Sequence, residues 1–206
     1  MARITNDPMG AISGMIGPTV FYTVKGKQYI RAAIREREKD SWSPGQVTYR
    51  QKVSKAAAFW GKLAANPARE SWKLAADGMS GYNLFLKTNL PAFKGDGSQM
   101  DLAWLHLSAG KLPLPHQLIA VAGEGDPTKW NVSWQDDSGN ALAQSDDELM
   151  VIFAQDGKFT NPLSTGVKRK QKKAVVQAPQ GTIQGMYLFF ASADGKLYSV
   201  DQFVRV

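Results

Sequence analysis

Two histidines and a short acidic run are the residues of this chain best suited to acid–base or metal chemistry. His106 and His116 lie in apolar surroundings, and residues 146–148 read Asp-Asp-Glu. A zinc site needs three or four ligands, so two histidines are too few. Consecutive carboxylates on a strand point in different directions and do not form an acid–base pair. The sequence therefore favours a protein that is not an enzyme and holds no metal or cofactor; an enzyme that uses either histidine is a third alternative.

The chain also lacks features of secreted and membrane proteins. It contains no cysteine, which excludes disulfides, thiolate metal sites and cysteine nucleophiles and fits a reducing compartment. No apolar run approaches the roughly 20 residues that span a bilayer. The first residues are interrupted by Asn6, Asp7 and Pro8, so they do not form a signal peptide. We expect a cytoplasmic protein, or a virion protein if a phage encodes it, with no membrane partner.

The basic side chains indicate more about the function of the protein than the histidines and carboxylates do. The net charge is +7, and residues 1–94 hold 15 basic and 6 acidic side chains, whereas residues 95–206 hold 10 and 12. This asymmetry indicates a polyanionic partner such as nucleic acid, although a basic soluble surface explains it equally well. The cations that we expect to face a polyanion are Lys25, Lys27, Arg31, Arg35, Arg50, Lys52, Lys55 and Lys62.

A β-hairpin is expected to position the first of these cations. Residues 19–24 are β-branched and aromatic and predict a strand. Lys25-Gly26 predicts a tight turn, and residues 27–34 predict the returning strand, with Tyr29 and Arg31 on one face. Such a hairpin could grip phosphates, or its charges could protect a sheet edge from aggregation. We favour the second interpretation.

Three helices are expected to position the remaining cations. Ser43-Pro44 and Asn66-Pro67 are helix starts, and residues 82–89 predict a third short helix. The first helix places its basic residues opposite one apolar stripe, made of Val53, Ala57, Trp60 and Ala64 and widened by Ala56 and Leu63. The stripe of the second helix consists of Trp72, Ala75, Ala76 and Met79. We expect the aromatic residues to form a core rather than a binding site, namely Trp60, Trp72, Tyr82 and Phe85.

The periodicity changes to two in the second half of the chain. Short strands separated by turn signals are predicted at residues 116–122, 129–135, 148–154, 173–178, 186–191 and 197–206. This spacing is typical of an antiparallel sandwich of immunoglobulin or fibronectin type. We therefore predict an α+β protein with a basic hairpin and three-helix module at 1–94, a linker at 95–110 and a β-sandwich domain at 111–206.

A run of cations at residues 168–173, Lys-Arg-Lys-Gln-Lys-Lys, precedes one predicted strand. As a nucleic-acid patch it is a weak signal, because such runs are common on solvated loops. We favour a solvated loop or charge that protects a sheet edge.

The order of several motifs resembles a known group of proteins. These motifs are Gly-Lys-x-Tyr-x-Arg at 26–31, Pro-x-Gln-x-x-x-Arg at 44–50, Trp-x-x-Leu at 60–63, Arg-x-x-Trp-x-x-Ala at 69–75 and Ser-Gly-Tyr-Asn-Leu-Phe at 80–85. In this order the chain resembles an uncharacterised bacterial and phage-associated family of unknown function. The resemblance implies a basic helical region before a β-sandwich-like half, and it supplies no catalytic residues.

The resemblance and the charge pattern lead to two functional hypotheses. The first is a non-enzymatic structural or assembly protein, of a phage-type virion or a mobile element, that is oligomeric and binds other protein subunits. The alternative is an architectural protein that binds DNA through its basic N-terminal module.

Overall fold

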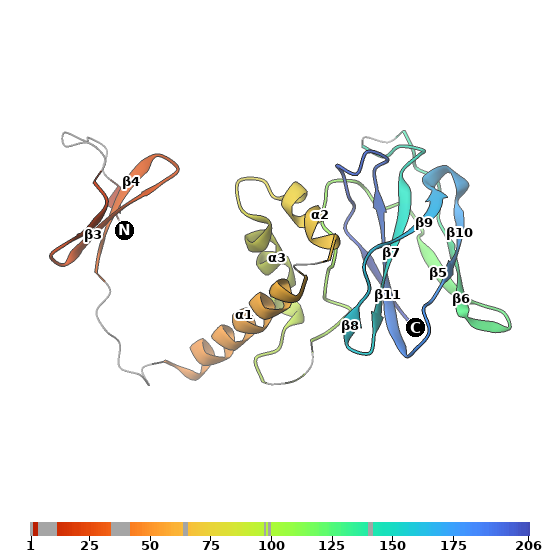
Figure 1. Cartoon of the computed structure of the whole chain (residues 1–206), viewed down its shortest axis with the longest axis horizontal. Coiled ribbons are helices and arrows are strands. Elements are labelled where there is room, and N and C mark those ends of the chain that lie inside the picture. The colour runs from red at the N-terminus through yellow and green to blue at the C-terminus, as the bar shows by residue number, and fades with distance from the viewer. Residues whose placement is uncertain are drawn as a thin grey trace. The chain divides into compact units, whose positions relative to one another are not determined.

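The computed structural model describes residues 2–3, 12–33, 42–63, 66–96, 98, 100–139 and 142–206. The chain divides into two compact units, Met1–Ser43 and Pro44–Val206, and each is described here by itself (Figure 1). Helices combine with antiparallel sheets, which confirms the predicted α+β class. The division falls between residues 43 and 44, whereas the sequence predicted one at residues 95–110. Separate folding on either side of 95–110 stays a prediction.

The N-terminal unit is an antiparallel sheet with strand order β1-β4-β3-β2. Its strands are β1 (Ala2–Arg3), β2 (Gly14–Ile16), β3 (Thr19–Val24) and β4 (Lys27–Ala32). The turn between β3 and β4 has φ of 49° at Lys25 and 73° at Gly26. Left-handed values at both positions are typical of the turn that joins hairpin strands, so the predicted hairpin is confirmed.

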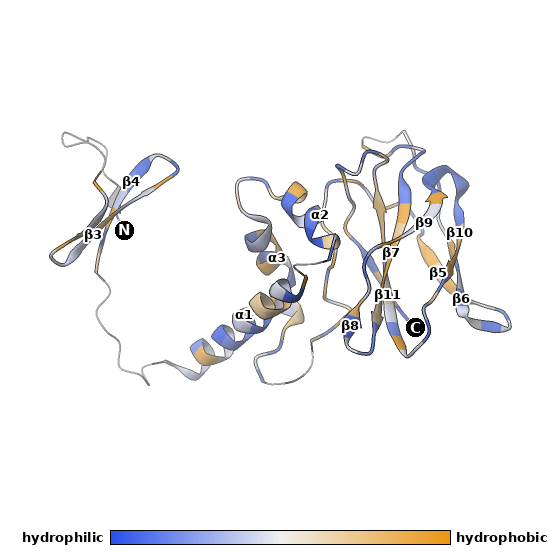
Figure 2. Ribbon diagram, viewed as in Figure 1, coloured by the Kyte–Doolittle hydropathy of each residue, from blue (hydrophilic) through white to orange (hydrophobic). Residues whose placement is uncertain are grey.

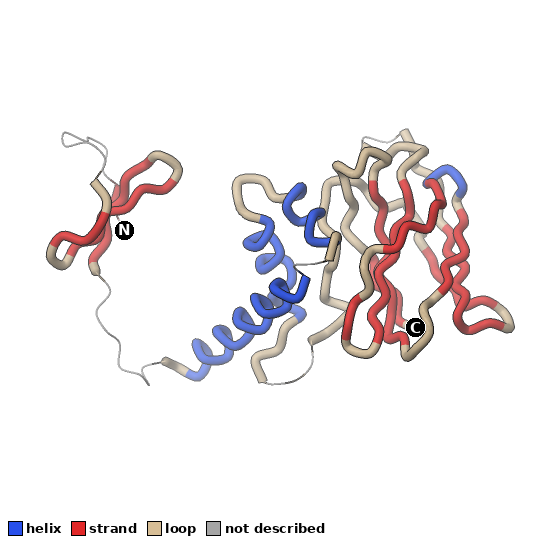
Figure 3. The backbone as a smooth tube through the Cα atoms, viewed as in Figure 1, coloured by secondary structure: helices blue, strands red, loops and turns tan. Residues whose placement is uncertain are grey.

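The C-terminal unit begins with the helices α1 (Pro44–Lys62), α2 (Ala68–Ala75) and α3 (Gly81–Asn89), followed by the 3-10 turn η2 (Leu90–Ala92) (Figure 3). The Asn66 carboxamide oxygen accepts the Ala68 N–H at 2.9 Å, and the Ser80 hydroxyl oxygen accepts the Asn83 N–H at 3.2 Å. Polar side chains therefore satisfy free N–H groups at two helix starts. The helix α2 ends at Ala75, because the backbone is already extended at Ala76, with a ψ of 119°. The predicted stripe, which ran to Met79, was therefore too long.

The aromatic core among the helices is confirmed. Trp60, Trp72 and Phe85 are buried, and Tyr82 is partly buried against them. The buried face of α1 contains Ala56 and Trp60 as predicted. It also contains Phe59, which was not predicted, while Val53 and Ala57 are only half-buried. Ala64 lies outside the described residues.

Two antiparallel sheets follow the helices. One has strand order β10-β6-β5 and consists of β5 (Ile119–Gly123), β6 (Asp126–Ser133) and β10 (Lys173–Gln177). The other has order β12-β11-β7-β8, with β9 paired to β7. Its strands are β7 (Glu148–Gln155), β8 (Lys158–Phe159), β9 (Leu163–Lys168), β11 (Ile183–Ala191) and β12 (Gln202–Arg205).

The strands predicted from the sequence agree with the structure at some positions and not at others. β7, β10 and β11 agree with the prediction to within a few residues. The strand predicted at 197–206 is correct only for β12, and β8 and β9 were missed. β9 contains Gly166 with a left-handed φ of 70°, which weakens the strand signal.

The central strands of the larger sheet, β7 and β11, are rich in hydrophobic residues (Figure 2). Alternate residues of these strands belong to two different cores, one on each face of the sheet. On one face Val151, Phe153 and Leu188 pack in a core with Val132 and Val176 of the smaller sheet. The opposite face packs in a second core with residues of the helices. The larger sheet is therefore covered on both sides. The immunoglobulin or fibronectin type of the two-sheet arrangement stays a prediction.

Candidate functional site

The described residues of the N-terminal sheet form no buried core. None of the described residues from 12 to 33 is buried, although they include large apolar side chains. Met15 is 68% exposed and the adjacent Ile16 is 62% exposed. Sheets of a few strands become stable by covering a hydrophobic face. The described part of this unit therefore leaves its large apolar side chains at least partly exposed.

The register of the N-terminal strands sorts their side chains onto two faces. Phe21 pairs with Ile30, Thr19 with Ala32 and Ile16 with Thr19, and directly paired residues lie on the same face. Among the described residues of β2, β3 and β4, this face has no charged side chain, and we call it the neutral face. Its members are Ile16, Thr19, Phe21, Thr23, Gln28, Ile30 and Ala32.

The opposite face combines aromatic and cationic side chains, and we call it the tyrosine face. Its members are Met15, Val20, Tyr22, Val24, Lys27, Tyr29 and Arg31. The rings of Tyr22 and Tyr29 stack, with centroids 5.7 Å apart and planes inclined by 22°. Lys27 and Arg31 on the returning strand belong to the predicted cationic set, and the register brings them to one face with both tyrosines.

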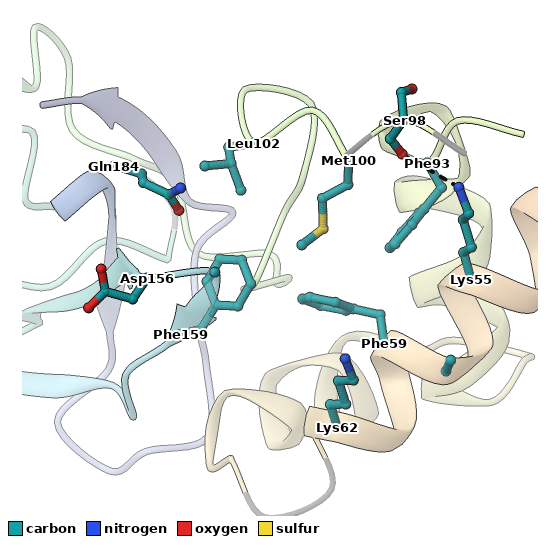
Figure 4. A pocket seen from close by; sticks show the side chains of 12 residues that line it. Lys55, Phe59, Lys62, Phe93, Ser98, Met100, Leu102, Asp156, Phe159 and Gln184 are labelled. Atoms are coloured by element: carbon teal, nitrogen blue, oxygen red, sulfur yellow. Dashed lines mark hydrogen bonds between the residues drawn. The ribbon is translucent and has the colours of Figure 1, made fainter. Parts of the chain in front are cut away.

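The predicted cationic set is divided between the two units. Lys25 lies in the turn after β3, and Arg35 lies outside the described residues. The other four cations lie on α1, where Arg50 is exposed and Lys52 is half-buried. The last two, Lys55 and Lys62, line a pocket (Figure 4).

Lys55 has a structural contact as well as a place in this pocket. Its Nζ donates to the carbonyl oxygen of Lys94 at 2.8 Å and lies 3.5 Å from that of Ser98. The ammonium therefore fastens the segment after η2 to α1. For Lys62, no ion pair forms within the described residues. Of the two pocket lysines, Lys62 is the one whose charge is available to a ligand.

His106 has a buried carboxylate as its partner. Its Nδ1 lies 2.7 Å from Oδ1 of Asp201, whose side chain is fully buried. Oδ2 of Asp201 accepts the backbone N–H groups of Leu107 at 2.5 Å and Ser108 at 2.9 Å. The hydrogen bond to Asp201 raises the pKa of the His106 imidazole, and partial burial opposes the rise.

A carboxylate that orients an imidazole is one half of a general-base site. The ring of His106, however, makes no second side-chain hydrogen bond within the described residues, so no activated nucleophile accompanies it. Asp201 holds two backbone N–H groups as well as the ring, and this fits a carboxylate that fixes the local chain. His116 is exposed, and within the described residues its ring forms no hydrogen bond to another side chain.

The cationic run at 168–173 contains a buried residue that the sequence did not reveal. The guanidinium of Arg169 donates to Asp147 at 3.1 Å, to Asp137 at 2.6 Å and to the carbonyl oxygen of Pro113 at 2.7 Å. It also lies over the ring of Phe190, 4.6 Å from the centroid. The interpretation as a wholly solvated loop was therefore wrong at Arg169, because acidic partners distant in sequence compensate its burial.

Across the described ranges, no three His, Asp or Glu side chains gather closely enough to hold a metal ion. In the same part of the chain, no helix is both long and apolar enough to cross a membrane.

The functional candidates that the sequence did not reveal share one property, which is that their contact partners lie far away along the chain. Asp201 is 95 positions after His106, and no spacing rule joins them. The pocket beside α1 combines Phe59 and Phe93 with Phe159 of the larger sheet. The exposed apolar residues of β2 could have been found from the sequence, since Met15 and Ile16 are large apolar side chains in a glycine-rich segment.

Comparisons with known proteins identify the family of the chain. No curated protein and no solved structure matches it significantly. A family model described as a family of unknown function, DUF6266, matches residues 11–204, which covers both units. The predicted resemblance to an uncharacterised family is thereby confirmed, and the chain belongs to the DUF6266 family.

Proposed function

We propose that this protein is a non-enzymatic assembly protein whose N-terminal sheet packs its neutral face against the neutral face of a second copy. The observation that carries the proposal is a sheet with large apolar residues and no buried residue among those described from 12 to 33. Burying a side chain such as Phe21 or Ile16 contributes about 1.5–3 kcal/mol, so covering the face stabilises both copies.

Charge favours a second copy as the occupant of the neutral face. Each chain carries a net charge of +7, so two copies repel each other wherever their cationic surfaces approach. Contact through a face without charges avoids a direct like-charge clash. The face is also self-complementary in chemistry, since it presents only apolar and neutral polar groups. Twofold pairing of one patch with itself is the commonest form of protein oligomer.

The tyrosine face is less suited to self-association. Lys27 and Arg31 on two copies would be brought together and partly desolvated without acidic partners from that face. The two faces therefore have different roles in the proposal, with one packing against protein and the other remaining in solvent. The resemblance found in the sequence extends the proposal to a particle component of a phage or mobile element.

Two adjacent exposed residues allow a sharp test. Ile16 lies on the neutral face and Met15 on the tyrosine face of the same strand, and both are more than 60% exposed. Because both side chains are exposed in the single chain, glutamate at either position costs the monomer little. We expect sedimentation equilibrium to show an oligomer for the wild type and for Met15→Glu, and a monomer for Ile16→Glu.

The matched pair also defines the outcome that overturns the proposal. A wild-type protein that stays monomeric at high concentration contradicts self-assembly. Equal dissociation by Ile16→Glu and Met15→Glu contradicts the assignment of the neutral face, because the glutamate would then act regardless of the face that carries it. Retained far-ultraviolet circular dichroism in both variants ensures that the comparison is made between folded proteins.

The tyrosine face supports nucleic-acid binding as a second candidate function. Stacked aromatic rings beside cations are the chemistry of single-stranded nucleic-acid surfaces, where bases stack on rings and cations neutralise phosphates. Tyr22, Tyr29, Lys27 and Arg31 supply both elements on one face. This arrangement is more specific than the overall basic charge, because it combines two kinds of contact.

Salt titration with a labelled single-stranded oligonucleotide tests this candidate. Binding should weaken steeply as salt rises, and Arg31→Gln should reduce the salt slope by about one. Tyr29→Ala should weaken binding by about fivefold or more through lost stacking. No binding at low salt, or equal losses for Arg31→Gln and for the α1 variant Arg50→Gln, would exclude the tyrosine face as the binding surface.

A further inference from the structure

The pocket between α1 and the larger sheet has a volume of about 680 Å³ and lies wholly within the C-terminal unit. This volume is within the range of small-molecule sites. Three phenylalanines, Phe59, Phe93 and Phe159, form its aromatic wall together with Met100 and Leu102 (Figure 4). The Phe59 ring meets Phe93 and Phe159 edge-on, with centroids 5.7 and 5.4 Å apart.

The charged residues of the pocket are arranged unevenly. Lys55 and Lys62 lie on α1, two turns and about 10 Å apart along the helix axis. Asp156 and Gln184 lie on the side of the larger sheet. An anionic group is therefore attracted toward α1 and repelled from Asp156. An apolar body extending from that group would lie against Met100 and Phe159.

We propose that this pocket binds an amphipathic carboxylate, with its apolar body against the aromatic wall and its carboxylate at Lys62. Lys62 is chosen because the ammonium of Lys55 is already bonded to the Lys94 carbonyl, whereas Lys62 has no ion pair in the described part of the chain. The polar end of the pocket then fixes the orientation of the ligand, and the aromatic wall supplies most of the affinity.

This binding site is independent of the proposed assembly. It uses residues of the C-terminal unit alone, so its failure would leave the neutral face untouched. The same independence holds in reverse, since Ile16→Glu should not change ligand binding.

Isothermal titration of the full chain with decanoate and with 1-decanol tests the proposal. The two probes share an apolar chain and differ in charge. We expect saturable binding of one decanoate per chain, about fivefold tighter than 1-decanol, which is the effect of an exposed ion pair of about 1 kcal/mol. Naphthalene-2-carboxylate, a flat aromatic acid, distinguishes an aromatic ligand from an acyl ligand by which acid binds more tightly.

Two lysine variants locate the carboxylate. Lys62→Gln should weaken decanoate binding to the level of 1-decanol and leave 1-decanol unchanged. Lys52→Gln removes the same charge from the same helix outside the pocket lining and should have no effect. Absence of saturable decanoate binding overturns the proposal. Equal binding of both probes, or equal losses in the two variants, overturns the role of Lys62.

Discussion

The two units of this protein use hydrophobic residues in opposite ways. In the C-terminal unit Trp72, Phe85 and Phe153 are fully buried, and both faces of the larger sheet are covered. In the N-terminal unit Phe21 is only half-buried and Ile16 is largely exposed. Both units have hydrogen-bonded antiparallel strands, so strand pairing alone does not make a core. This difference is the reason for proposing that a second copy covers the N-terminal sheet, whereas the two cores of the C-terminal unit are built from its own residues.

The C-terminal unit also pairs its buried charges internally. Arg169 meets Asp137 and Asp147, and Asp201 meets His106 and two backbone N–H groups. Buried charges are tolerated when they are paired in this way. Substitutions in this unit should therefore change its own unfolding free energy, whereas substitutions on the neutral face should change association.

The largest effect is expected for Trp72→Ala. Trp72 is fully buried, and its indole N–H donates to the carbonyl oxygen of Leu107 at 3.0 Å. Removing the ring leaves a cavity and an unpaired carbonyl, which should lower the unfolding free energy by about 4–5 kcal/mol. Urea unfolding followed by circular dichroism measures this change. A loss below about 1 kcal/mol, as expected for the partly exposed Tyr22→Ala, would contradict the contrast between the units.

The second-largest loss of unfolding free energy is expected for Arg169→Met, which keeps an apolar contact with Phe190 but removes the guanidinium. Asp137 and Asp147 then lose their shared cation at a buried site. The unfolding free energy should fall by about 3 kcal/mol. The neighbouring variant Lys170→Met, at an exposed position of the same run, is the control and should change stability by less than about 0.5 kcal/mol. Equal effects would mean that the run acts as one solvated patch.

A smaller, pH-dependent effect is expected for His106→Gln. Asp201 raises the pKa of His106, so the contact between them stabilises the folded state. This stabilisation is fully present below the ordinary histidine pKa of about 6.5. It is lost as the pH rises through the higher pKa of the folded state. The variant should therefore lose about 1 kcal/mol more unfolding free energy at low pH than at high pH. Urea unfolding at both pH values measures the difference.

The control for this pH effect is His116→Gln. The exposed ring of His116 forms no hydrogen bond within the described residues, so its substitution should change the unfolding free energy by less than about 0.5 kcal/mol. A pH-independent loss in His106→Gln would contradict the ionic contact with Asp201.

The smallest effect is expected for Gly26→Ala at the turn of the N-terminal hairpin. Gly26 has a φ of 73°, and alanine at such a position is strained by about 1 kcal/mol. Amide hydrogen exchange should become faster in β3 and β4 and stay unchanged in β7 and β11, since the units are separate compact bodies. Faster exchange in β7 would show that the two units unfold together.

Patterns among neighbouring residues predicted the helices and strands better than they predicted the burial and the contacts of individual side chains. Thr19–Val24 and the Lys25-Gly26 turn were found from β-branched residues and glycine, because hairpin geometry is set by neighbouring residues. The burial of Arg169 and the pairing of His106 with Asp201 were not found, because their partners lie far away in the sequence. The pocket wall was missed for the same reason, since α1 and β8 contribute to it together.

The central claim is that the neutral face of one copy covers the neutral face of another. Because the chain has no cysteine, Thr23→Cys on this face and Val24→Cys on the tyrosine face each give a single site for a nitroxide spin label. Facing sheets pack about 10 Å apart, so labels at residue 23 should be closer together than labels at residue 24. Dipolar electron paramagnetic resonance should show a short distance between copies for Thr23→Cys and a longer one for Val24→Cys. No dipolar coupling in either variant, or a shorter distance for Val24→Cys, would contradict the claim.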